Sequence, residues 1–152
     1  MNQGKAANKS GNKLKKFVCD ILLSKGYIEL PKEKFRPGIY LEQPIFSKGY
    51  IIKPNIYEGE THCDFIIFHP EKHSKCLIIE CKWQQKAGSV DEKFPYIVEN
   101  IKNHYPHNAI LILDGGGYKR SAEKWVKAQV NAKFISVFNM SEFQKWANDG
   151  KL

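Results

Sequence analysis

The sequence predicts an α/β fold in which a central mixed β-sheet is flanked by helices. Apolar residues recur at helical spacing near the start of the chain and in several later segments. Short β-forming runs lie between these segments, and one of them, residues 109–113 (AILIL), is apolar at every position. A continuously apolar strand is expected where both faces of a sheet are covered. The helices are therefore expected on both sides of the sheet.

We expect a single domain over residues 9–152, preceded by a flexible basic arm over residues 1–8. The domain begins with a helix that starts at about Lys9 or Ser10 and is ended by Gly26. Apolar residues at helical spacing form its buried face: Leu14, Phe17, Val18, Ile21 and Leu22.

A β-rich block follows a loop over residues 27–38, which is predicted from its prolines and glycine. The expected strands cover residues 40–46, 50–56, 62–69 and 75–84. A turn through residues 70–74 joins the last two strands into a hairpin, so that they become neighbours in the sheet.

The second half alternates helices and strands. Ser89 and Glu92 are spaced as a capping box at the start of a helix that is expected to reach Asn103, and Pro95 should kink this helix or delay its start. The later expected elements are a strand over 109–113, a loop over 114–117, a helix over 121–130, a strand over 134–138 and a helix over 141–148.

A formal net charge of +8 favours a polyanionic partner, because each phosphate that a basic side chain neutralises releases a counterion. A basic protein kept soluble by its lysines is the alternative. No apolar run is long enough for a transmembrane helix, and no apolar segment follows the basic N-terminus as in a secretory signal. We therefore expect a cytoplasmic protein with reduced cysteines and no membrane partner.

Charged residues end the strand expected over residues 75–84. Side chains alternate along a strand, so Glu80, Lys82 and Gln84 share one face. Asp64 lies on the neighbouring strand of the hairpin. Two carboxylates beside a lysine suit a hard cation, Mg²⁺ or Mn²⁺, rather than zinc. The alternative is an ion pair between Glu80 and Lys82 at a solvated strand end.

Two other motifs are weaker. His69, His73 and Cys76 are spaced as H-x3-H-x2-C, but they straddle the hairpin turn and lack an obvious fourth ligand, so structural zinc is not expected. Residues 114–120 (DGGGYKR) lack the GxxxxGK[ST] spacing, so we expect no nucleotide cofactor. A tight turn is favoured there over a phosphate-binding loop.

Asp64 followed, after a turn, by Glu80-Cys81-Lys82 resembles the D…(D/E)-x-K core of the PD-(D/E)XK nuclease superfamily. The glutamine two residues beyond the lysine, the leading helix and the AILIL strand also fit this pattern, which extends over residues 9–138. The resemblance implies the restriction-endonuclease-like fold with an αβββαβ core.

The resemblance also implies metal-dependent hydrolysis of a DNA phosphodiester. Asp64 and Glu80 would bind Mg²⁺ or Mn²⁺, with the backbone carbonyl of Cys81 as a further ligand. Lys82 would act on the nucleophilic water, and Gln84 would support the site or touch a phosphate. Candidate DNA contacts follow these positions: Lys86, Lys93, Tyr118, Lys119 and Arg120.

This sequence departs from the family pattern in two places. Cys63 stands where a proline usually precedes the first acid. The leading helix often carries a metal-facing glutamate, whereas here Lys15 or Lys16 fills that position, which leaves open whether one metal ion or two are bound. Glu60 is a further carboxylate, for which a surface position is expected.

We therefore expect a Mg²⁺-dependent DNA endonuclease, of a restriction type or from a phage or mobile element. Cutting both strands with one site per chain implies a homodimer. A Holliday-junction resolvase or a DNA-repair nuclease is an alternative within the same class. A non-catalytic nucleic-acid-binding module on the same fold is the alternative from another class.

Overall fold

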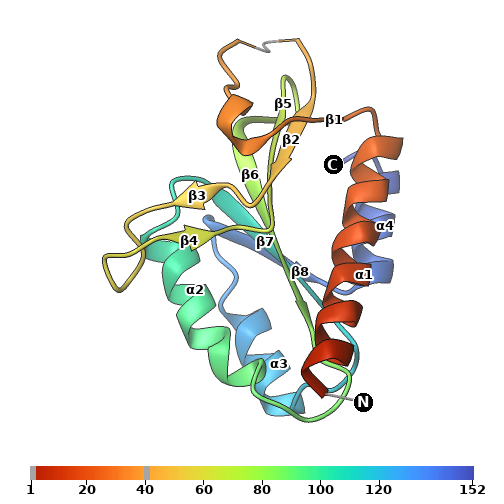
Figure 1. The fold of residues 1–152 in the computed structure, drawn as a ribbon, viewed down its shortest axis with the longest axis vertical. Coiled ribbons are helices and arrows are strands. Elements are labelled where there is room, and N and C mark those ends of the chain that lie inside the picture. Colours follow the sequence, from red (N-terminus) through yellow and green to blue (C-terminus); the bar gives the residue numbers. More distant parts are fainter. Residues whose placement is uncertain (1–2, 40–41) are drawn as a thin grey trace.

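The computed structural model describes residues 3–39 and 42–152, and it confirms the predicted α/β fold. A six-stranded mixed sheet lies between two pairs of helices (Figure 1). The helices α1 (Gln3–Ser24) and α4 (Met140–Asn148) cover one face, and α2 (Phe94–Asn103) and α3 (Arg120–Ala128) cover the other. None of the helices in the described part of the chain is long and apolar enough to cross a membrane.

The strand order in the sheet is β1-β2-β5-β6-β7-β8. The strands are β1 (Ile28–Glu29), β2 (Ile45–Lys48), β5 (Phe65–His69), β6 (His73–Trp83), β7 (Asn108–Asp114) and β8 (Phe134–Phe138). Antiparallel pairing joins β2, β5 and β6, whereas β1 pairs parallel with β2, and β6, β7 and β8 run parallel to one another. A separate two-stranded sheet is formed by β3 (Ile51–Ile52) and β4 (Thr61–His62).

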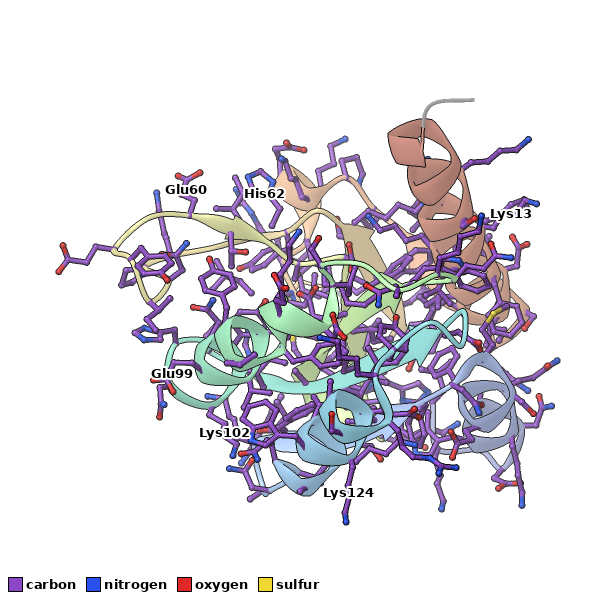
Figure 2. The ribbon with its side chains drawn as sticks, turned by 90° about the horizontal axis from the view of Figure 1, so that it is seen from below. Lys13, Glu60, His62, Glu99, Lys102 and Lys124 are labelled. Carbon is purple, nitrogen blue, oxygen red and sulfur yellow. The ribbon has the colours of Figure 1, made fainter. Side chains whose placement is uncertain are left out.

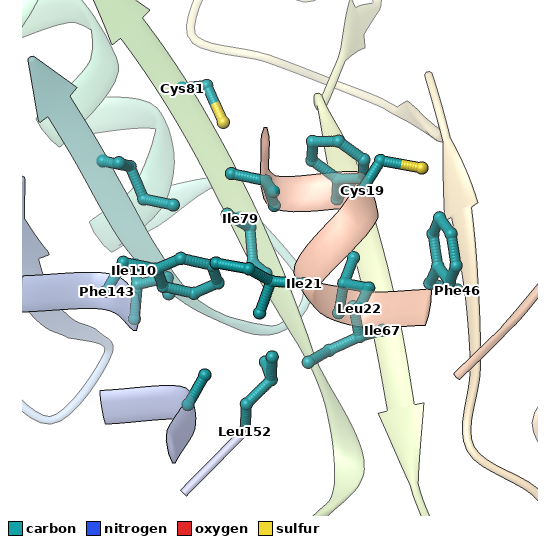
Figure 3. Close-up of a cluster of buried hydrophobic side chains, with 14 of the residues drawn as sticks. Cys19, Ile21, Leu22, Phe46, Ile67, Ile79, Cys81, Ile110, Phe143 and Leu152 are labelled. Atoms are coloured by element: carbon teal, nitrogen blue, oxygen red, sulfur yellow. The ribbon is translucent and has the colours of Figure 1, made fainter. Parts of the chain in front are cut away.

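Alternation along the strands divides the apolar core between the two faces of the sheet. Leu77, Ile79 and Cys81 of β6 point into the cluster beneath α1 and α4, which Figure 3 shows in close-up. Ile78, between them, joins the second cluster beneath α2 and α3. Both clusters also take residues from β5 and β7, so the central strands are covered on both sides, as the AILIL run predicted.

The first helix begins at Gln3, which is earlier than the predicted start near Lys9 or Ser10. Ala6 and Ala7 lie in this added part, and alanine is the strongest helix former. Met1 and Asn2 of the expected arm lie outside the described residues, and the flexibility of residues 1–8 stays a prediction.

The prediction of a capping box between Ser89 and Glu92 is wrong. A short 3₁₀ turn, η2 (Asp91–Lys93), precedes α2, and no side chain caps either element. Pro95 lies in the first turn of α2, where its missing N–H costs no hydrogen bond. Of the two expected effects of Pro95, a kink or a later start, the structure shows the later start. A true capping box occurs at α4, between Asn139 and Glu142.

The early strands also differ from their expected bounds. The strand expected over residues 40–46 is instead β2, which continues through Ser47 and Lys48, while residues 40–41 lie outside the described part. Only Ile51–Ile52 of the run 50–56 is a strand, because the side chain of Asn55 turns the chain by accepting hydrogen bonds from the N–H groups of Tyr57 and Gly59. Asn55 therefore ends β3 early, just as Gly49, with its positive φ, separates β3 from β2.

The loop after β7 packs directly on the chain that follows β6. The N–H of Gly117 donates to the Gln84 carbonyl over 2.7 Å, and a Cβ at Gly117 would lie 2.6 Å from the Gln85 carbonyl carbon. At Gly115, where φ is +104°, a Cβ would collide with the Gln84 carbonyl oxygen. These backbone contacts support the tight-turn interpretation of the glycine run.

We expect Gly115→Ala to lower the free energy of unfolding by about 2 kcal/mol more than Gly116→Ala. Both glycines have positive φ, but nothing lies within 4 Å of a Cβ at Gly116, so the pair separates the collision with Gln84 from backbone strain. Urea unfolding of the two variants measures the difference. Equal losses would contradict the close packing of this loop on the end of β6.

Candidate active site

The candidate site forms where β5 and β6 separate. The antiparallel register pairs Phe65 with Ile79, and one more step of this register places Asp64 opposite Glu80. Asp64 was expected within a strand over residues 62–69. It lies instead in the short link between β4 and β5. The chain leaves the sheet at this point, so the carboxyl group of Asp64 is free to turn toward β6.

Both carboxylate oxygens of Asp64 are engaged. Oδ2 accepts a hydrogen bond from the N–H of Cys81 over 2.7 Å. Oδ1 lies 3.0 Å from Nζ of Lys15, which reaches across from α1. Partial burial lowers the pKa of Lys15, but the charge and the hydrogen bond of Asp64 outweigh it and raise the pKa above its usual value. The Asp64 side chain is only 11% exposed, so it depends on these partners.

Glu80 is buried beside this pair, with 5% of its surface exposed. The hydroxyl of Tyr105 donates to its Oε1 over 3.0 Å. Burial, together with the negative charge of Asp64, raises the pKa of Glu80 to about 8, against the opposing charge of Lys82. Without a cation, this carboxyl is therefore mainly protonated at neutral pH, and a nearby positive charge would favour its ionised form.

The thiol of Cys81 lies on the other face of β6, within the core cluster beneath α1 and α4 (Figure 3). Burial, together with the charges of Asp64 and Glu80, raises the pKa of this thiol well above its usual range, so the sulfur stays protonated. The N–H and C=O of one strand residue point to the same neighbouring strand, so the Cys81 carbonyl faces the gap beside Asp64.

Lys82 follows on the same face as Glu80, and its side chain is partly exposed at the end of β6. The hydroxyl of Tyr118 donates to the Lys82 carbonyl over 2.7 Å, which holds this end of the strand. In the described part of the chain no ion pair joins Glu80 and Lys82, and the ion pair of the site is instead the one between Lys15 and Asp64.

Gln84 is buried, and both ends of its amide are engaged within the protein. Nε2 donates to the Gly117 carbonyl over 3.0 Å, and Oε1 accepts from the N–H of Val90 over 2.8 Å. These bonds tie the end of β6 to the glycine loop and to the approach to α2. Gln84 thus holds in place the strand end that carries Lys82.

Among the expected DNA contacts, the structure leaves four basic side chains exposed: Lys86, Lys93, Lys119 and Arg120. Tyr118 differs from them, because its hydroxyl is bonded to Lys82 and its ring packs on Phe94 with centroids 5.5 Å apart. Glu60 lies exposed in the link between β3 and β4 (Figure 2). Its carboxylate pairs with Nζ of Lys53 at 3.7 Å. Glu60 is thus at the surface, as expected.

Two residues of the site were not assigned to these roles from the sequence. The sequence pattern places Lys15 or Lys16 at the usual glutamate position, whereas the contact of Lys15 with Asp64 depends on how α1 packs. Tyr105 carries no sequence signal, because a tyrosine between a helix and a strand is ordinarily core packing.

A cleft of about 510 Å³ opens beside Asp64, lined by Asn12, Lys15, Lys16, Cys19, Lys48, Gly49, His62, Cys63, Asp64 and Phe65.

The donor set fits one hard divalent cation. Asp64, Glu80 and the Cys81 carbonyl offer only oxygen atoms, and Mg²⁺ and Mn²⁺ bind such sets with water as the remaining ligands. Within residues 3–39 and 42–152, no group of three or more His, Cys, Asp or Glu side chains is placed to hold a metal ion. His69 and His73 instead bond to backbone groups near the hairpin turn and the C-terminus.

We expect Glu80→Gln to raise the melting temperature of the metal-free protein at pH 9 by several degrees and to change it little at pH 5. The folded-state pKa of about 8 lies above the usual 4.5, so the cost of burying an ionised Glu80 appears as the pH rises through this interval. The glutamine keeps an acceptor for Tyr105. Melting curves in EDTA across this range measure the effect.

The exposed Glu92 offers a matched control, because Glu92→Gln removes the same charge at the surface. If Glu80→Gln and Glu92→Gln changed the melting temperature in parallel across the pH range, burial of Glu80 would not be the source of the effect.

A comparison with protein families agrees with this geometry. A family profile described as PD-(D/E)XK nuclease superfamily domain matches residues 6–151. No curated protein and no solved structure matched the chain. The matched range contains Asp64, Glu80 and Lys82 together with every strand of the sheet. The chain therefore belongs to the PD-(D/E)XK nuclease superfamily, as the Asp64…Glu80-Cys81-Lys82 pattern predicted.

Proposed function

We propose that this protein is a Mg²⁺- or Mn²⁺-dependent DNA endonuclease. The observation that carries the proposal is the meeting of Asp64 and Glu80 at the point where β5 and β6 separate, with the Cys81 carbonyl facing the same gap. Membership of the nuclease superfamily supports a phosphodiesterase activity on nucleic acid. The raised pKa of Glu80 supports a cation site, because a divalent cation would relieve the repulsion that Asp64 and burial impose on it.

In this proposal the carboxylates of Asp64 and Glu80 and the carbonyl of Cys81 hold the cation. When bound, the cation supplies Lewis-acid stabilisation of negative charge on the phosphoryl group. Lys82 orients the attacking water by hydrogen bonding and stabilises charge on a phosphoryl oxygen. Tyr105 orients Glu80, and the bonds of Gln84 and Tyr118 hold the end of β6, so that these groups keep a fixed geometry.

DNA is the proposed substrate, because the net charge of +8 and the lysines that line the cleft beside Asp64, which are Lys15, Lys16 and Lys48, suit a polyanion. A restriction-type or phage or mobile-element enzyme acting as a homodimer in the cytoplasm is the form that we propose. A single site per chain would then cut one strand, and a two-fold axis would bring a second site to the other strand. A junction resolvase or a repair nuclease would use the same site on a different DNA structure.

A non-catalytic nucleic-acid-binding module is the second candidate. The ion pair between Lys15 and Asp64 supports it, because an ammonium group already compensates the carboxylate that a metal ion would require. The exposed basic side chains would then bind nucleic acid without cutting it.

Cleavage of plasmid, phage and four-way-junction DNA tests the two candidates. We expect cutting in Mg²⁺ and none in EDTA, with a loss of at least about 100-fold in Asp64→Asn and in Lys82→Ala, because each removes a group at the reacting centre. Glu60→Gln and Lys145→Ala are matched controls on exposed residues outside the candidate DNA contacts and should keep most of the cutting activity. DNA binding without cleavage by the native protein would favour the binding module.

The candidate DNA contacts are tested separately through the salt dependence of binding. We expect the double variant Lys119→Gln with Arg120→Gln to reduce the slope of log K against log[salt] by about 2, since each lost phosphate contact lowers it by about 1. Lys145→Gln with Lys151→Gln removes the same charge from exposed residues at the C-terminal end of the chain. Fluorescence anisotropy with one DNA duplex measures both slopes, and equal reductions would contradict a local contact at the start of α3.

A further inference from the structure

The first helix α1 places the ammonium group of Lys15 directly beside Asp64, with Nζ 3.0 Å from Oδ1. We propose that Lys15 is a built-in counter-ion of the cation site. Its ammonium group compensates Asp64 while no metal is bound, and a divalent cation binds by displacing it. This inference rests on the proposed function, because it concerns how the same site takes up its metal.

The ion pair occupies the atom that a cation would need. Oδ2 of Asp64 is held by the Cys81 N–H at 2.7 Å, and Oδ1 faces the Lys15 ammonium at 3.0 Å. A divalent cation and an ammonium group repel each other strongly at such short distances. Only one of them can neutralise Asp64 at a time, so metal binding at this carboxylate is an exchange of cations.

The packing of α1 fixes the position from which Lys15 acts. Leu14 and Val18, on either side of it along the helix, are buried in the core, so the backbone at Lys15 cannot drift from the sheet. The Lys15 side chain itself is 48% exposed and lines the cleft of about 510 Å³ beside Asp64. The ammonium group therefore has room to leave Asp64 without any change in the fold.

Two other lysines of this cleft form ion pairs of an ordinary surface kind. Lys16 pairs with Asp20, whose side chain is 58% exposed, and Lys48 pairs with Glu29, whose side chain is 39% exposed. Water already solvates those carboxylates, so such pairs contribute little. Asp64 is 11% exposed and lies beside a second buried carboxyl, so it requires a positive partner. Lys15 supplies that charge until a metal ion does.

Titration of Mn²⁺ into the metal-free protein tests the exchange without any nucleic acid. We expect Lys15→Gln to bind Mn²⁺ about 3- to 30-fold more tightly than the native protein, because the competing charge is gone. Lys16→Gln removes the same charge from the neighbouring residue and should stay within about twofold of native. Isothermal titration calorimetry at one pH and one salt concentration measures the three dissociation constants.

Thermal melting gives a second readout that a purely structural role of Lys15 would not produce. In EDTA, Lys15→Gln should melt below both the native protein and Lys16→Gln, because Asp64 has lost its partner. Saturating Mn²⁺ should then raise the melting temperature of Lys15→Gln more than that of the native protein. A loss of stability that Mn²⁺ does not restore would overturn the proposal, since it would make Lys15 a structural residue only.

Asp64→Asn separates a failure of this inference from a failure of the proposed function. If the native protein binds Mn²⁺, Asp64→Asn does not, and Lys15→Gln binds no more tightly than Lys16→Gln, only the exchange is overturned. If Lys15→Gln binds Mn²⁺ and the native protein does not, the exchange is supported and the proposed metal-dependent activity is overturned. If no variant binds Mn²⁺, both proposals fail.

Discussion

The hydrogen bond from the Cys81 N–H to the Asp64 carboxylate is the contact on which the rest of the site depends. It joins two segments that are about to separate, because β5 begins at Phe65 while β6 continues to Trp83. A backbone N–H at a strand edge would otherwise lack a partner after the neighbouring strand has ended. The carboxylate that satisfies this N–H is thereby placed opposite Glu80, so the pairing of the sheet also sets the geometry of the two acids.

Two carboxyl groups that lie close together in a partly buried site repel each other when both are ionised. The neighbouring residues reduce this repulsion. Glu80 responds by holding its proton, with Tyr105 donating a hydrogen bond to it. The charge of Asp64 is compensated by Lys15, which reaches it from α1. In the proposed metal site, a bound divalent cation would offset this electrostatic cost.

Much of the fold could be predicted from local patterns because those patterns record burial. The AILIL run, the hairpin and the terminal helix all report on which residues are covered, and each was found within a few residues of its expected bounds. The errors occurred where a polar side chain decided the backbone. Ser89 and Glu92 have the letters of a capping box, but neither η2 nor α2 has a side-chain cap, and the Gln84 side chain holds this segment through the Val90 N–H. The spacing of Ser89 and Glu92 alone cannot show that Gln84 takes part in holding this segment.

The sequence by itself determined the family, the two acids and the lysine of the motif, because strand alternation and the D…ExK spacing are local properties of the chain. Only the tertiary structure decided how these groups are compensated. Lys15 and Tyr105 lie far from Asp64 and Glu80 in sequence, and they meet them because α1 packs on one face of the sheet and the end of α2 on the other. Charge compensation depends on distance in space, which no spacing along the chain records.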